Sequence, residues 1–188
     1  MAEDLTPQID TLYSDYENKP YISSDRDLES FLKEVSENAS KKVSKHNMEK
    51  TEEGLLPGDI ILLWRISHGS FTNQFHYHKY FEYDYGINGD AHKWQLIKEG
   101  YVREYTPTES LGILTAGHLK KMLKAKGVSG YSKLRKAELV EAVSETYDDK
   151  ELDQKFENRG YALTKKGQTT LDNNQEIINR HPQKSMYK

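Results

Sequence analysis

The sequence predicts a mainly α-helical protein with a small β component. Apolar residues recur at intervals of three and four along several segments, as in Leu28, Phe31, Leu32 and Val35, which is the spacing of an amphipathic helix. Several of these segments also begin at a capping-type residue and stop at a glycine. Only two short segments, residues 101–106 and 160–164, are typical of strands.

Composition limits the class of protein. The chain has 188 residues, of which 35% are hydrophobic and 30% charged, so it forms one or two domains with a real core. It has no cysteine, which excludes disulfides, thiol nucleophiles and cysteine-based zinc sites and fits a reducing compartment. The longest apolar run, residues 60–64, is far too short to cross a membrane. With no secretory signal visible either, we expect a cytoplasmic protein without a membrane partner.

The N-terminal part is acidic. Residues 1–22 are interpreted as an arm whose Tyr13, Tyr16 and Tyr21 pack onto the body. Residues 24–45 are predicted to form a helix with Ser24 as its N-cap. Residues 1–59 carry 14 acidic and 7 basic side chains, a net charge of −7 against −3 for the whole chain.

The central part alternates short helices with turns. Pro57 and Asp59 suit a helix N-terminus, and residues 60–66 are predicted to form a buried helix, although so short an apolar run leaves a strand open. Residues 80–85 are predicted to form a short helix that turns at Gly86. Asp90 is expected to cap a helix over 91–99 that stops at Gly100 and leads into the first strand.

The C-terminal part completes the element order. Residues 147–157 are acidic and predicted to be helical, and residues 160–164 form the second strand. Thr164 is expected to cap a helix over 165–173, and residues 176–188 are interpreted as a polar tail.

The feature that points to function is a basic island at residues 114–143. Seven lysines and arginines face two glutamates there, a net charge of +5 inside an acidic protein, which is the electrostatic pattern of a polyanion-binding surface. Thr115 should cap a first helix that ends at Gly127, and a second helix is expected over 135–146. The residues predicted to contact nucleic acid are Lys120, Lys121, Lys124, Lys126, Tyr131, Ser132, Lys133, Arg135 and Lys136.

The pattern LT…LKKMLKAKGV…KAELVEAV resembles the SAP domain, a short two-helix DNA-binding module. Its loop, GYSKLRKAEL, is more similar to the helical module at the N-terminus of the transcription terminator Rho. The resemblance covers about 30 of 188 residues. It implies binding to DNA, mainly through the backbone, with RNA as the alternative ligand. Tyr131 either stacks on a base or closes the hairpin core.

The flanking fragments HKWQLIKEGYVREYT and RGYALTKKGQTTL resemble the recognition helix and wing of a winged-helix domain. This resemblance implies four segments: an N-terminal arm and helix (1–52), a split winged-helix-like domain (53–112 with 147–175), an inserted SAP/Rho-N-type hairpin (113–146) and the tail (176–188). The helix over 91–99, with His92, Lys93 and Lys98, is a base reader, a core helix or a dimer contact.

The prediction is therefore a non-catalytic DNA-binding protein that needs no metal or cofactor. GLLPGDI and KYFEYDYGIN also resemble segments of small proteins of Gram-positive bacteria and their phages that carry SAP-like modules. One alternative is an interaction protein that docks a protein partner or a second copy through the hairpin and the acidic N-terminal helix. Another is a metal-dependent enzyme using His76 and His78, although no further ligands are spaced nearby.

Overall fold

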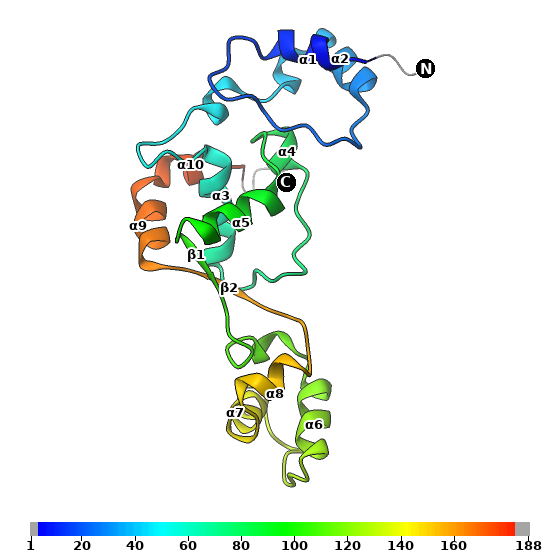
Figure 1. The fold of residues 1–188 in the computed structure, drawn as a ribbon, viewed down its shortest axis with the longest axis vertical. Helices are drawn as coiled ribbons and strands as arrows, with labels where there is room; N and C mark the ends of the chain where they lie inside the picture. The colour runs from blue at the N-terminus through cyan, green and yellow to red at the C-terminus, as the bar shows by residue number, and fades with distance from the viewer. Residues whose placement is uncertain (1–3, 183–188) are drawn as a thin grey trace. The chain divides into compact units, whose positions relative to one another are not determined.

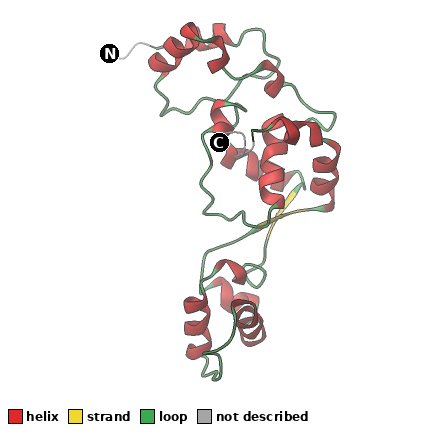
Figure 2. Cartoon of the chain, turned by 180° about the vertical axis from the view of Figure 1, so that it is seen from behind, coloured by secondary structure: helices red, strands yellow, loops and turns green. Residues whose placement is uncertain are grey.

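The computed structural model describes residues 4–182, and over these the chain is mainly helical with one small two-stranded antiparallel sheet. Figure 2 colours the helices red and the two strands yellow. Strand β1 (Val102–Glu104) pairs with β2 (Tyr161–Leu163) although 56 residues separate them along the chain. The prediction of a mainly α protein with a small β component is confirmed.

The described residues form two compact units. Unit 1 holds residues 4–65, 76–102 and 164–182, and unit 2 holds residues 66–75 and 103–163. This grouping differs from the four predicted segments, because residues 1–52 do not separate from the helical body and the second unit extends beyond 113–146 on both sides. Figure 1 shows helices α6 (Ala116–Ala125), α7 (Lys136–Thr146) and α8 (Asp149–Asp153), which all belong to unit 2.

The N-terminal part of unit 1 has its own apolar cluster. Helices α1 (Thr6–Leu12) and α2 (Leu28–Glu37) and two 3-10 turns, Ala39–Lys41 and Lys45–Met48, surround it. Its buried members are Ile9, Tyr13, Phe31, Val43 and Met48. The predicted arm is therefore a folded part of the unit, in which Tyr13 is buried, Tyr16 is half-buried and Tyr21 stays exposed.

The rest of unit 1 contains five further helices. They are α3 (Pro57–Ser67), whose last two residues belong to unit 2, α4 (Tyr80–Tyr83), α5 (Gly89–Lys98), α9 (Lys165–Asn173) and α10 (Gln175–Arg180). The run 60–63 is fully buried in α3, so the choice between helix and strand left open by the sequence resolves to a helix. Gly86 (φ +59°) and Gly100 (φ +83°) take the left-handed turns predicted for them.

Two predicted helix caps are wrong by a few residues. Asp27, rather than Ser24, caps α2 by accepting a hydrogen bond from the Ser30 N–H at 3.0 Å. Asn88, rather than Asp90, caps α5 through the Ala91 N–H at 3.2 Å. In each case the predicted cap and the observed cap lie within three residues of each other, and both residue types suit the N-cap position.

The predicted polar tail begins with a helix that is buried on one side. In α10 the side chains of Ile177 and Ile178 are buried, and His181 directly after it is only 7% exposed. Because polar residues surround these two isoleucines, the composition of the segment does not indicate an apolar helix face. Residues 183–188 of the predicted tail lie outside the described residues.

His181 lies in an aromatic cage. Its Nδ1 is 2.7 Å from the Tyr85 hydroxyl oxygen, and its ring packs edge-on against Tyr80 and Trp64, with centroids at 4.8 and 5.5 Å. Burial lowers the pKa of His181, and the positive charge of Arg65 lowers it further. The neutral imidazole is therefore the form that fits this site.

Unit 1 is expected to lose stability as the pH falls below about 6.5, the unperturbed value for histidine. Below that pH the histidine of the unfolded chain binds a proton, whereas the buried imidazole of the folded chain stays neutral. The free energy of unfolding therefore has its full value above that pH and decreases below it. Urea unfolding at pH 7.5 and pH 5.5 should show this loss for the wild type and a smaller one for His181→Gln. An equal loss in both proteins would contradict the assignment.

Candidate nucleic-acid interface

The basic island folds as the predicted helical hairpin. Helix α6 (Ala116–Ala125) and helix α7 (Lys136–Thr146) are joined by a ten-residue loop. Leu119, Met122 and Leu123 of α6 and Leu139 and Val143 of α7 are buried in one apolar cluster. The Tyr147 hydroxyl donates a hydrogen bond to the Met122 carbonyl oxygen at 2.8 Å, so the end of α7 is fastened to the middle of α6.

Helix α6 begins and ends at the residues expected from the sequence. Thr115 caps it by accepting a hydrogen bond from the His118 N–H at 3.2 Å. At its end, Gly127 (φ +72°) donates to the Lys124 carbonyl and Val128 donates to the Leu123 carbonyl, at 3.0 and 3.1 Å. This pair of bonds is a Schellman motif, and Val128 packs on the apolar cluster. Both ends of the helix that carries the lysines are therefore fixed by hydrogen bonds.

The loop brings the second group of cations to the start of α7. The Lys120 ammonium donates to the Ser132 carbonyl oxygen at 3.0 Å and so ties α6 to the loop. The Glu138 carboxylate accepts the Arg135 backbone N–H at 2.7 Å. Arg135 is the N-cap residue of α7 and has no side-chain acceptor, so no side chain caps the first N–H groups of this helix.

Five of the nine predicted contact residues have exposed, positively charged side chains. No ion pair joins any of these five to another residue in the range 4–182. They are Lys121, Lys124, Lys133, Arg135 and Lys136. The helical spacing sets Lys121 and Lys124 opposite the buried stripe of α6. We call these five residues the basic face.

Of the other four predicted residues, Lys120 and Ser132 support the loop through their mutual bond, and Tyr131 lies half-buried against the hairpin core. Lys126 is bound elsewhere. Its ammonium forms a salt bridge with Glu151 and lies 4.7 Å from the centroid of the Tyr147 ring. This ion pair holds the pKa of the Glu151 carboxyl below its usual range.

Lys126→Ala is expected to change DNA affinity by no more than about twofold, because the charge it removes is already compensated by Glu151. Lys124→Ala, the matched change two residues earlier on the basic face, should weaken binding and lower the salt dependence by about one phosphate contact. Fluorescence anisotropy with labelled duplex DNA measures both. Equal losses in the two variants would show that Lys126 also contacts the ligand.

The structure adds a third helix to the module that sequence reasoning had left outside it. In α8 (Asp149–Asp153), Leu152 is fully buried in the same cluster as Leu119, and Phe156 follows it there. Asp148 caps α8, and the exposed side chains of this segment are mostly acidic. The charges of the module are therefore separated, with cations on α6 and the loop and carboxylates on α8.

Helix α5 does not offer a second basic surface. His92 Nδ1 lies 2.6 Å from Asp59 Oδ1, and Asp59 is only 6% exposed. Lys93 is buried and pairs with Asp90 at 3.2 Å. Of the three predicted cations of this helix, Lys98 alone stays exposed. Sequence reasoning missed the exposed aromatic side chain of this helix, Trp94, because a tryptophan in a helix is usually interpreted as core.

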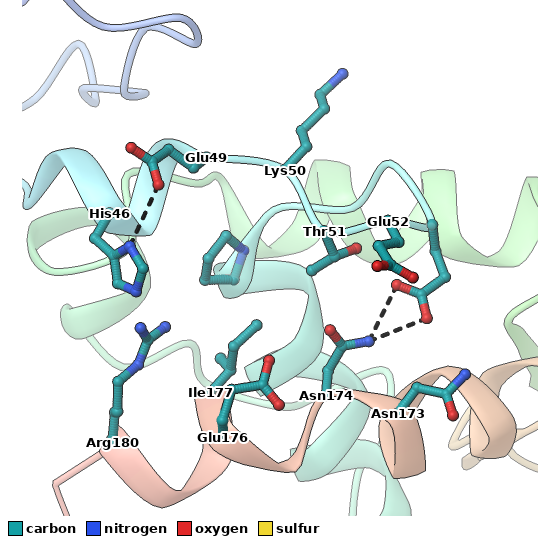
Figure 3. A pocket seen from close by; sticks show the side chains of 12 residues that line it. His46, Glu49, Lys50, Thr51, Glu52, Asn173, Asn174, Glu176, Ile177 and Arg180 are labelled. Atoms are coloured by element: carbon teal, nitrogen blue, oxygen red, sulfur yellow. Dashed lines mark hydrogen bonds and ion pairs between the residues drawn. The ribbon is translucent and has the colours of Figure 1, made fainter.

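A polar cavity of about 660 Å³ in unit 1 is an alternative candidate site. Figure 3 shows how its side chains engage one another: the Asn174 amide donates to both carboxylate oxygens of Glu53 at 3.2 and 3.1 Å, and His46 lies 3.3 Å from Glu49. Because charges of both signs line the cavity, it shows no preference for one class of ligand.

No group of three or more histidine and acidic side chains among residues 4–182 is placed to hold a metal ion. The helices of the same range include none that is both long and apolar enough to cross a membrane. Neither the models of protein families nor the solved structures with which the chain was compared gave a match.

Proposed function

We propose that the protein binds nucleic acid, with duplex DNA as the preferred ligand, and that the basic face of the α6–α7 hairpin makes the contact. The observation that carries the proposal is the set of five exposed cations without carboxylate partners among the described residues, in a chain whose net charge is −3. Binding of such a cluster to DNA releases counterions from the phosphates, which makes the binding free energy more favourable.

The geometry supports contacts to phosphate more than to bases. Lys121 and Lys124 lie one turn apart on α6, and Arg135 and Lys136 stand where the uncapped N–H groups of α7 point outward. A helix N-terminus with free N–H groups stabilises a phosphate. Contacts to phosphate fix position but carry little sequence information, so weak sequence preference follows.

The body of the protein fits the winged-helix expectation in its order of elements. Helices α3, α4 and α5 precede β1, and β2 leads into α9, with the hairpin module inserted between the two strands. We propose the winged-helix arrangement as the framework of the module, without a base-reading role for α5. The resemblance of the hairpin to SAP and Rho N-terminal modules, and the cytoplasmic location expected from the sequence, remain part of the proposal.

The test is fluorescence anisotropy with labelled duplex DNA, single-stranded DNA and RNA over a salt series. For duplex DNA, about 3 to 5 neutralised phosphates predict a slope of roughly −3 to −5 in a plot of log affinity against log salt. Stronger binding to RNA would replace the proposed ligand. No binding at low salt would overturn the proposal and favour docking of an acidic protein on the same face.

A further inference from the structure

Helix α5 carries an unusual exposed side chain. Trp94 is 53% exposed, the highest value among the large apolar side chains described as exposed. Its neighbours on the same side, Ala91, Gln95 and Lys98, are exposed as well. Tryptophan is enriched at the centre of protein interfaces and rare on free surfaces, because it buries a large area at a low cost in conformational entropy.

The Trp94 ring already has a contact within its own chain. The Lys93 ammonium lies 4.4 Å from the ring centroid, and Lys93 is itself buried and paired with Asp90 at 3.2 Å. A cation over an indole face is a favourable contact. A ring ordered in this way loses less freedom on binding than a mobile side chain, which raises the affinity available from its burial.

The charges around Trp94 are self-complementary. Asp90, Trp94 and Lys98 are spaced by four residues each along α5, so they lie on one side of the helix with the ring at the centre. The acid and the base each lie about 6 Å from it along the axis. When two such helices pack antiparallel about a twofold axis at Trp94, Asp90 of each copy faces Lys98 of the other.

We propose that α5 is the interface of a homodimer, in which two copies of this chain pack antiparallel through Trp94. A second copy fits this surface better than nucleic acid does, because the surface bears one exposed acid and one exposed base at its two ends and an aromatic ring between them. An isologous contact of this kind closes on itself and gives a dimer. Its small area predicts a weak, concentration-dependent association.

A dimer would carry two basic faces, one from each copy. Joining two sites turns the second contact into an intramolecular step and raises the overall affinity without any new contact. This consequence depends on the proposed nucleic-acid function, whereas the dimer does not: it is measured on the protein alone.

Sedimentation velocity over a concentration series tests the interface directly. The wild type should move from a species of 21.8 kDa toward twice that mass as its concentration rises. Trp94→Ala should weaken the association by at least about tenfold, and Tyr83→Ala, which removes another exposed aromatic ring, should leave it unchanged. A wild type that stays monomeric throughout, or a dimer that survives Trp94→Ala, would overturn the proposal; circular dichroism verifies that each variant is folded.

Cross-linking tests the antiparallel geometry, because the chain contains no cysteine. A mixture of Asp90→Cys and Lys98→Cys proteins should form a mixed disulfide on mild oxidation, since these positions face each other across the twofold axis. Neither variant should link to itself at the same rate. As a further control, Lys33→Cys on α2 should not link at all. Faster self-linking of Asp90→Cys would indicate a parallel pairing and refute the proposed interface.

Discussion

A variant with Lys121→Ala, Lys124→Ala, Arg135→Ala and Lys136→Ala is expected to bind duplex DNA at least about 100-fold more weakly than the wild type at low salt. The estimate follows from about four lost phosphate contacts, which together also account for a roughly 100-fold fall in wild-type affinity between about 50 and 200 mM salt. The salt dependence should disappear with the affinity, because the same side chains cause both.

The matched control removes the same charge from elsewhere. Lys33→Ala, Lys41→Ala, Lys150→Ala and Lys155→Ala take four exposed cations from α2, the turn after it, and the acidic side of the module. If binding depends on the basic face, this variant should keep nearly the full salt slope. If the two variants lose affinity equally, net charge rather than the geometry of the hairpin attracts the DNA.

Leu139→Ala is expected to have the largest effect on stability in unit 2. Leu139 is fully buried where α7 meets α6, and truncating a leucine in such a site costs about 2–5 kcal/mol in the free energy of unfolding, through lost burial and the cavity left behind. Val143 and the hydrogen bond from Tyr147 to Met122 also hold α7 beside α6.

The measurement is urea unfolding followed by circular dichroism, with hydrogen exchange to locate the change. Amides of residues 116–146 should lose protection more than those of α3. Glu141→Ala, two residues further along α7 on its exposed side, is the control and should shift stability by no more than about 0.5 kcal/mol. DNA affinity should fall with the unfolding of the hairpin in Leu139→Ala and be kept in Glu141→Ala.

The sequence predicted the elements that depend on local signals. The stripe Leu119, Met122 and Leu123, the Thr115 cap and the Gly127 stop together specify α6, and the structure shows each of them in that role. Thr164 likewise caps α9, accepting a hydrogen bond from the Gly167 N–H at 3.2 Å. Such features are settled within one or two turns of chain and need no knowledge of tertiary contacts.

Contacts formed by tertiary packing could not be predicted in the same way. Lys126 looked like another phosphate ligand because Glu151, which pairs with it, lies 25 residues away. Lys93 was counted as a cation of a candidate base-reading helix; its burial depends on tertiary packing, although its partner Asp90 lies only three residues away. The two isoleucines of α10 were hidden among polar residues. Each miss is a pairing or a burial that only the folded chain brings about.

The connection between the strands and the hairpin module has a practical consequence. The Tyr105 N–H donates to the Gly160 carbonyl oxygen at 2.8 Å, so the 54 residues between them leave and rejoin the chain at adjacent points. We expect the segment to be replaceable as a unit, because a two-residue turn of the asparagine–glycine type spans the same gap in ordinary hairpins. Recombination or engineering can exchange such an insert while the strand pair that receives it is preserved.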